Sequence, residues 1–237
     1  MAAGLFMIPN PYPGIFLAVE GIDGAGKTEL IKALTARLQE RFPEATVKTT
    51  KEPDRTGSYG RLIYKDLFDP QGLHVHYPKV FQGWYAADSK QNVRDRVIPF
   101  IASRTNFYVV ISDRYRPSVV YGAADAADIR ELMAMTEAVM GEHFIWPDAV
   151  FILDVTVDIA LERLRRKNVK LDGFERRSKL SAISNLYHLF SQLYPFNCYS
   201  ISADGSIENT LDLIWPTVET IVLHKKENPD LLLAPLG

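Results

Sequence analysis

The sequence predicts an α/β fold in which a mostly parallel, five-stranded sheet carries helices on both faces. Five short runs of apolar and β-branched residues are typical of buried strands, and they lie at residues 15–19, 45–50, 107–112, 149–154 and 199–203. Longer segments with apolar residues at helical spacing separate these runs. Regular alternation of strands and helices is the pattern of a parallel sheet that is covered on both sides.

The helices follow from the same periodicity, and they lie at residues 29–42, 61–68, 80–103, 129–140, 157–167, 179–194 and 207–223. In the first of them, Leu30 and Leu34 fall on one face. Pro99 lies inside the third, so we expect it to end or kink that helix. Residues 52–58 and 69–78 are rich in turn-forming residues and predict loops.

Composition and charge exclude several classes of protein. The chain has 237 residues, which suits one domain, and its net charge of −2 provides no basic field to hold a nucleic acid polymer. No apolar run approaches the about 18 residues that a membrane span needs, and the first residues lack the features of a signal peptide. Cys198 is the single cysteine, which fits a reducing compartment. We therefore expect a cytoplasmic protein that does not contact membranes.

A glycine-rich turn joins the first predicted strand to the first predicted helix. Residues 21–28 read Gly-Ile-Asp-Gly-Ala-Gly-Lys-Thr and match the pattern G-x-x-x-x-G-K-[ST] in full. Backbone N–H groups of such a turn surround a phosphate, and the positive end of the following helix adds to the attraction. We expect Lys27 to reach the β- and γ-phosphates and the Thr28 hydroxyl to hold Mg²⁺. A turn that binds nothing is the alternative, but it does not explain why all the fixed positions are filled.

Polar residues also follow the strand at 107–112. Asp113 is placed to hold Mg²⁺ opposite Thr28, and Arg114 is placed to clamp an anionic oxygen with its planar fork. A surface ion pair at a strand end is the alternative. Because ligands of parallel sheets bind beyond the carboxyl ends of the strands, the phosphate loop favours the functional interpretation.

Two further segments are candidates for a site. Residues 163–170 carry five cations in eight positions, which fits either a solvated helix face or a lid that neutralises a transferring phosphoryl group. The phosphate loop has Gly24 and Ala25 and so offers no cation besides Lys27, which favours the lid. In the long helix, Tyr85 is placed to stack on a base, with Asp88 and Ser89 nearby to form hydrogen bonds; ordinary core packing is the alternative.

Several segments together resemble the thymidylate kinase family. The resemblance runs from about residue 14 to about residue 222, so it covers nearly the whole chain. The similar segments are Phe16 to Thr28, Thr50-Lys-Glu-Pro53, Tyr85-Ala-Ala-Asp88, Val110-Ile-Ser-Asp-Arg-Tyr115 with Ser118, Leu171-Asp-Gly-Phe-Glu175 with Tyr187, and Ser202-Ala-Asp-Gly-Ser206.

The resemblance implies a P-loop kinase fold with a short lid, and ATP- and Mg²⁺-dependent phosphorylation of dTMP to dTDP by a homodimer. The implied catalytic residues are Asp23, Lys27, Arg114, Arg163 and Arg166. ATP would contact Gly21, Asp23, Gly24, Ala25, Gly26, Lys27, Thr28, Ala203 and Asp204. The acceptor would contact Asp23, Lys51, Glu52, Tyr85, Asp88, Ser89, Arg114, Ser118 and Tyr121, and the metal would contact Thr28 and Asp113.

The same resemblance divides the chain into an N-terminal extension (1–13), a single kinase domain (14–224) and a C-terminal tail (225–237). The lid of the kinase domain would lie at about residues 163–175.

The chain departs from the family at the base pocket. Ser89 replaces an arginine that contacts the pyrimidine carbonyl in the family, and a water bridge from Ser89 or a cation such as Lys90 or Arg94 would have to compensate. Lys51 replaces another arginine, Gly173 replaces a lid arginine, and the aromatic Tyr121 comes one residue early.

Two alternatives to a dTMP kinase remain open on the sequence. One is a kinase for another pyrimidine monophosphate or for a deoxynucleoside, in which Glu20 or Glu52 would act as the base. The other is a nucleoside triphosphatase that acts as a switch, which would need a residue to orient water.

Overall fold

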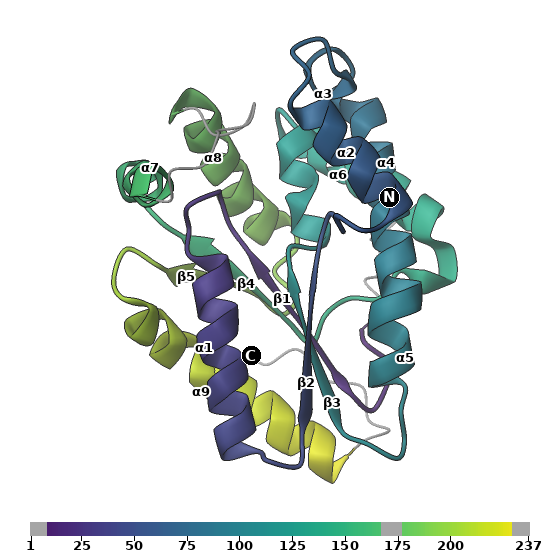
Figure 1. Cartoon of the computed structure of the whole chain (residues 1–237), viewed down its shortest axis with the longest axis vertical. Coiled ribbons are helices and arrows are strands. Elements are labelled where there is room, and N and C mark those ends of the chain that lie inside the picture. Colours follow the sequence, from purple (N-terminus) through teal and green to yellow (C-terminus); the bar gives the residue numbers. More distant parts are fainter. Residues whose placement is uncertain (1–8, 167–176, 229–237) are drawn as a thin grey trace.

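The computed structural model describes residues 9–166 and 177–228, and their core is one five-stranded sheet (Figure 1). The strands are β1 (Ile15–Glu20), β2 (Thr46–Lys51), β3 (Tyr108–Asp113), β4 (Ala149–Asp154) and β5 (Cys198–Ser202). Their order is β2-β3-β1-β4-β5, and every neighbouring pair is parallel. The predicted α/β class and the five predicted strands are confirmed.

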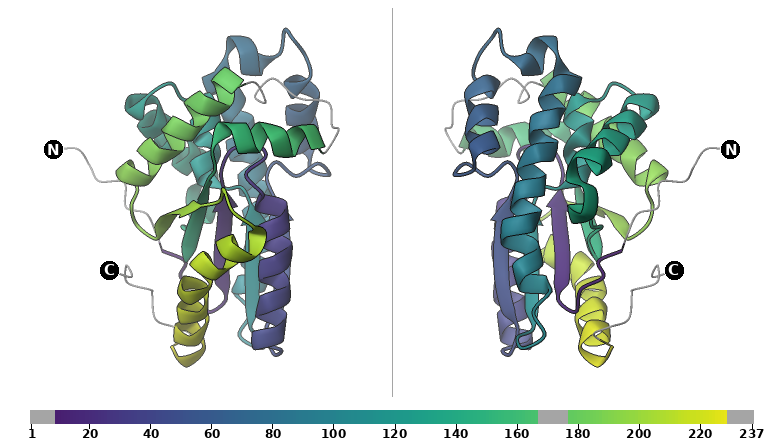
Figure 2. Two further views of the ribbon diagram at one scale, coloured as in Figure 1. Left: turned by 90° about the vertical axis from the view of Figure 1, so that its left-hand side faces the viewer. Right: turned by 90° about the vertical axis from the view of Figure 1, so that its right-hand side faces the viewer.

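Helices cover both faces of this sheet (Figure 2). They are α1 (Lys27–Arg41), α2 (Ser58–Leu67), α3 (Leu73–His76), α4 (Pro78–Asn92), α5 (Ile98–Ile101), α6 (Ala126–Met140), α7 (Val157–Arg166), α8 (Arg177–Leu193) and α9 (Ile207–Glu227). Helices α1 and α9 pack on each other over one face, whereas α5 and α8 contact strands from the other. No helix among the described residues is long and apolar enough to cross a membrane.

The long predicted helix at 80–103 is divided. A π-helical turn, Val93–Val97, separates α4 from α5, and Pro99 lies in the first turn of α5. Proline has no N–H to continue the α-helical bonding, so the wider turn before it takes up the mismatch.

The predicted turns at 69–78 contain the single turn of α3. There, the Asp66 carboxylate accepts hydrogen bonds from the backbone N–H groups of Leu73 and His74, at 2.7 and 3.0 Å.

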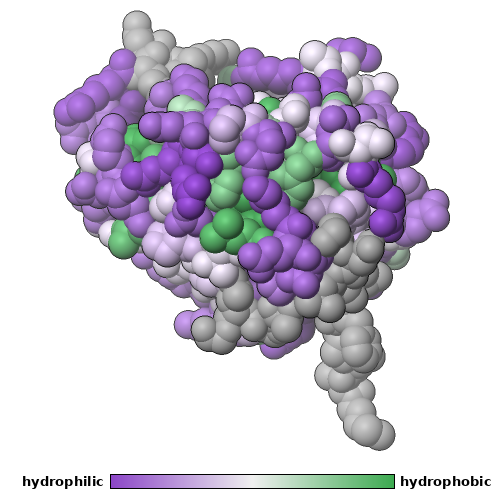
Figure 3. All heavy atoms as spheres, turned by 90° about the horizontal axis from the view of Figure 1, so that it is seen from below, coloured by the Kyte–Doolittle hydropathy of each residue, from purple (hydrophilic) through white to green (hydrophobic). Residues whose placement is uncertain are grey.

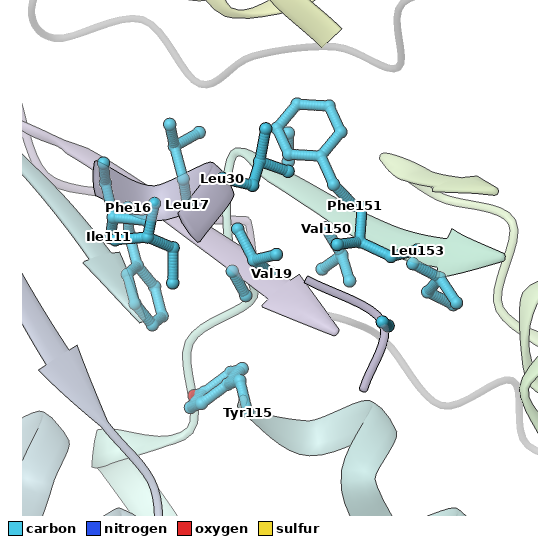
Figure 4. Close-up of a cluster of buried hydrophobic side chains, with 14 of the residues drawn as sticks. Phe16, Leu17, Val19, Leu30, Ile111, Tyr115, Val150, Phe151 and Leu153 are labelled. Carbon is cyan, nitrogen blue, oxygen red and sulfur yellow. The ribbon is translucent and has the colours of Figure 1, made fainter. Parts of the chain in front are cut away.

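The core forms where β1 lies between β3 and β4. All six residues of β1 are buried, which explains why this strand is an unbroken apolar run up to Glu20. Figure 4 shows Leu17 of β1 on the same side of the sheet as Leu30 of α1, whereas the Phe16 ring points to the other side, where its centre lies 5.0 Å from that of the Tyr115 ring. Each such large apolar side chain contributes about 1.5–3 kcal/mol when it is removed from water. The core therefore holds the central strand, and with it the loop that follows, in a fixed place.

The strand order places a crevice at the end of β1. The chain leaves β1 to build β2 and β3 on one side and later returns to add β4 and β5 on the other, which is the switch point where α/β sheets bind ligands. The register pairs Lys51 of β2 with Asp113 of β3 at this edge. The opposite end of the molecule carries mostly polar side chains around a small apolar area (Figure 3).

Both ends of the described chain pack on the body. Lys225, in the last turn of α9, is buried; its ammonium donates to the carbonyl oxygen of Tyr12 at 2.8 Å and lies 3.6 Å from the Asp148 carboxylate. Helix α9 therefore runs past the boundary that the sequence predicts at residue 224. The division into extension, domain and tail stays a prediction.

Candidate active site

The phosphate loop occupies the turn between β1 and α1, as predicted. Gly21, Gly24 and Gly26 have φ values of 131°, 85° and 99°, which residues with a side chain rarely adopt. Helix α1 begins at Lys27, so the N–H groups at its start have no partners within the helix and are available to a ligand. The Lys27 ammonium folds back on the loop and donates to the carbonyl oxygens of Gly21 and Ile22, at 2.9 and 3.0 Å.

Helix α7 fixes the shape of the loop at Gly24. A Cβ atom built on Gly24 would lie 2.3 Å from the backbone oxygen of Ala160, well inside van der Waals contact. No side chain fits at this position while α7 stays where it is. The absence of a cation at position 24 is therefore a requirement of packing as well as of backbone conformation.

Arg163 joins the loop to the segment after β5. Its guanidinium donates to the carbonyl oxygen of Ala25 at 3.3 Å, of Ala203 at 3.0 Å and of Gly205 at 3.1 Å. The Asp204 carboxylate accepts from the backbone N–H of Thr156 at 2.7 Å. The structure thus brings the residues predicted to contact ATP to one edge of the sheet.

The predicted lid is described only in part. Arg166 ends α7, is exposed and pairs with Glu162 of the same helix. The predicted lid residues from 167 to 175, including Gly173, lie outside the described residues.

Thr28 and Asp113 form a fitting site for Mg²⁺. The Thr28 hydroxyl lies 3.5 Å from one Asp113 oxygen, which also receives the Lys51 ammonium at 3.1 Å. The other Asp113 oxygen is buried and has no hydrogen-bond partner. Burial raises the pKa of Asp113, but the charges of Lys27 and Lys51 outweigh it and hold that pKa below its usual value. An anionic oxygen without a partner, beside a hydroxyl, suits a cation that takes its remaining ligands from phosphates and water.

Asp23 connects the two cations of the site. Its carboxylate lies 2.5 Å from the Arg114 guanidinium and 3.9 Å from the Lys27 ammonium. Burial opposes its charge, but Arg114 and Lys27 keep the pKa of Asp23 below its usual value. Arg114 has a φ of 77°, a left-handed conformation that turns the chain directly after β3. Burial lowers the pKa of Lys27 to about 8, and the positive Arg114 adds to this effect.

Glu20 holds the far side of Arg114. This fully buried carboxylate accepts hydrogen bonds from the Tyr115 backbone N–H at 2.5 Å, the Ser118 hydroxyl at 2.9 Å and the Tyr187 hydroxyl at 2.8 Å. The Arg114 guanidinium donates to the Tyr187 oxygen at 3.2 Å and lies 4.8 Å from the centre of the Tyr121 ring. These contacts support the guanidinium from several elements, so it is positioned before any ligand arrives.

A pocket opens between this arginine and α2. It is lined by Asp23, Lys51, Glu52, Pro53, Arg55, Tyr64, Leu67, Tyr85, Arg114, Ser118 and Tyr121. Seven of the nine predicted acceptor contacts are among these residues; Asp88 and Ser89 are not. Asp88 is buried, and its carboxylate accepts from the backbone N–H of Asp54 at 3.0 Å, so it supports the loop after β2. Burial and the nearby Glu52 raise the pKa of Asp88 to about 7.

The residues proposed to compensate for Ser89 point elsewhere. The Lys90 ammonium donates to the carbonyl oxygen of Val139 at 3.0 Å, and the exposed Arg94 pairs with its neighbour Asp95. Arg116, which no sequence pattern singled out, is buried and lies 2.8 Å from a Glu52 oxygen. The available signal was its position only three residues after the buried strand β3. So short a segment keeps the side chain close to the end of the sheet.

One carboxylate paired with two cations, Lys27 in the phosphate loop and Arg114 in the neighbouring pocket, is an arrangement for bringing two phosphates together. The fold and the site therefore define a phosphotransferase built on a phosphate loop.

Comparison with known proteins identifies the family. Residues 19–214 match the family model described as thymidylate kinase. A thymidylate kinase of Chlamydia trachomatis is 32% identical over 168 residues, which are 70% of this chain and 78% of the relative. One of Caldicellulosiruptor saccharolyticus is 30% identical over 88% of this chain and 98% of the relative, and a probable thymidylate kinase of Archaeoglobus fulgidus is 28% identical over 90% and 100%. The chain belongs to the thymidylate kinase family, and the predicted membership is confirmed.

Proposed function

We propose that this protein transfers the γ-phosphoryl group of ATP to dTMP, which yields ADP and dTDP for the synthesis of dTTP. The single observation that carries the proposal is the position of Asp23, between Lys27 of the phosphate loop and Arg114 of the pocket beside α2. Each cation is available to one phosphate, so donor and acceptor meet end to end. Family membership supports the choice of a thymidylate as the acceptor.

On the donor side, Lys27 and the N–H groups of the loop bind the phosphates. Thr28 and Asp113 would hold Mg²⁺, which neutralises charge on the β- and γ-oxygens when it is bound. Arg163 and Arg166 are the proposed lid cations, and Arg163 already contacts the loop through Ala25. The donor side positions the phosphates of ATP and neutralises their charge, so the transfer needs no covalent intermediate.

On the acceptor side, Arg114 grips the phosphate of dTMP and Tyr85 stacks on the base. A phosphate oxygen is already anionic, so no general base has to remove a proton. Glu20 and Glu52, the two candidate bases for a nucleoside acceptor, are instead engaged by Ser118 and Tyr187, and by Asn92 and Arg116. Their hydrogen bonds favour a monophosphate over a nucleoside.

An acceptor panel with labelled ATP tests the proposal. We expect label in dTDP when dTMP is present and little label transfer to thymidine. Release of the label only as inorganic phosphate, whichever acceptor is added, would contradict a kinase and favour a triphosphatase. Omission of Mg²⁺ should abolish transfer.

The proposed assembly is a homodimer, in a reducing compartment such as the cytoplasm. Among the described residues, six of the eight exposed large hydrophobic side chains lie on α2, α3 and α4 or between them: Tyr59, Leu62, Phe68, Val75, Tyr77 and Val80. These three helices contact one another, so their exposed residues provide an apolar face for a second copy. Leu62→Glu should yield monomers in analytical ultracentrifugation, whereas Leu213→Glu on α9 should not. Equal effects of the two would contradict this interface.

A further inference from the structure

A buried cluster lies behind the acceptor pocket, and Glu52 is its centre. One Glu52 oxygen accepts from the Asn92 amide at 3.0 Å. The other accepts from the Arg116 guanidinium at 2.8 Å and from the Ser89 hydroxyl. Arg116 also contacts the Ser89 hydroxyl directly, although the two residues are far apart in the sequence. The guanidinium of Arg116 therefore occupies the space next to position 89.

The side chain at position 89 is short and buried. Ser89 follows Tyr85 by four residues on α4, so the two share one face of the helix. In the family segment that the chain resembles, an arginine stands here and contacts the pyrimidine carbonyl. Ser89 cannot span that distance, but its small size leaves room for the guanidinium that arrives from the end of β3.

Arg116 has hydrogen-bonding capacity that the protein does not use. The residue is 3% exposed, and its Nε–H is buried without a partner. Arg116 lines a narrow cavity together with Gln82 and Val119. This cavity adjoins the acceptor pocket, because both are lined by Glu52, Tyr85, Arg114 and Ser118. A buried donor without a partner costs free energy, so a ligand that accepts a hydrogen bond there gains from the match.

We propose that Arg116 replaces the missing helix arginine and determines base specificity, by donating a hydrogen bond to the exocyclic carbonyl oxygen of the base, opposite the sugar. This inference rests on the proposed function. Glu52 and Ser89 hold the guanidinium in place. Thymine and uracil present an acceptor at this position, whereas cytosine presents an amino group, which is a donor and leaves the guanidinium unpaired. The enzyme should therefore accept dTMP and dUMP and reject dCMP.

The decisive variant is Arg116→Lys. Lysine keeps a positive charge against Glu52, so the protein should fold, but a single ammonium cannot serve both Glu52 and the base. We expect the ratio of kcat/KM for dTMP to that for dCMP to fall at least about tenfold, with the KM for ATP unchanged. Removal of a hydrogen bond that a polar site was built to make has effects of this size or larger.

A second variant moves the guanidinium back to the helix. Arg116→Met alone leaves Glu52 buried without its cation and should lower both thermal stability and activity on dTMP. Ser89→Arg combined with Arg116→Met should restore the preference for dTMP over dCMP. The double variant separates base recognition from a purely structural role, because only recognition predicts recovery of the ratio.

The outcomes distinguish this inference from the proposed function. If the wild-type protein phosphorylates no pyrimidine monophosphate, the proposed function fails. If the wild type is active and Arg116→Lys folds with an unchanged ratio of dTMP to dCMP, the inference is overturned. Equal loss of activity on both nucleotides in Arg116→Lys would also overturn it, because that result assigns Arg116 to structure alone.

Discussion

The close contact between Gly24 and α7 makes a quantitative prediction for Gly24→Ala. The new Cβ would lie 2.3 Å from the Ala160 oxygen, whereas ordinary contact begins at 3.4 Å, so the loop and the helix must separate by about 1 Å. A displacement of about 1 Å in a positioned site costs on the order of 100-fold in rate. The φ of 85° adds strain of roughly 1–2 kcal/mol for a residue with a side chain.

Gly141 provides a matched control. It has a φ of 59°, but a Cβ built on it meets nothing within 4 Å, and it lies at the end of α6. Gly141→Ala therefore carries backbone strain without a clash. We expect both variants to unfold at lower temperature, but only Gly24→Ala to lose about 100-fold in kcat/KM.

Steady-state kinetics with ATP and dTMP, alongside thermal unfolding, make the comparison. Wild-type rates in Gly24→Ala would contradict this prediction, because the contact with α7 would then have no role in placing the loop. An equal loss of rate in Gly141→Ala would refute it as well, since strain alone would explain the result.

Three other residues carry further predictions. Lys27→Ala should reduce kcat by orders of magnitude with little change in the unfolding temperature. Because Lys27 has a pKa of about 8, kcat/KM for ATP should fall above about pH 8 in the wild type, as the ammonium loses its proton; a flat profile to pH 10 would contradict this. Arg114→Ala should raise the KM for dTMP or lower kcat far more than it weakens ATP binding in calorimetry, and equal loss of both substrates would reassign the arginine. Asp113→Asn should raise the Mg²⁺ concentration for half-maximal rate, while binding of ATP without metal changes little.

The sequence predicts the parts of this structure that depend on local patterns. Continuous apolar runs such as β1 and the fixed spacing of the phosphate loop each specify one conformation, and both are found as predicted. The π-helical turn before Pro99 was not predictable in detail, because a proline inside a helix allows either a stop or a bend. The choice depends on packing of the residues around it.

The role of Arg116 was hidden for a different reason. Comparison along one helix shows that an arginine is absent at Ser89, and it directs attention to neighbours on that helix such as Lys90 and Arg94. The replacement comes from the end of β3, and only the folded chain brings Arg116 against Ser89. The role of Asp88 was hidden in the same way. Its carboxylate accepts a hydrogen bond from the Asp54 backbone and so supports the loop after β2, which the spacing of residues along α4 does not reveal.

Helix α7 connects two features that the sequence presents separately, a loop without its own cation and a basic segment further along the chain. Gly24 lets the backbone of α7 approach the loop, and Arg163 of the same helix bonds to Ala25 in that loop. The helix that carries the basic residues is thus fixed directly to the phosphate-binding backbone. A cation introduced into the loop by Gly24→Arg would therefore push α7 away rather than add charge to the site. In this protein, the arginines of α7 can lie beside the phosphate loop only because residue 24 is a glycine.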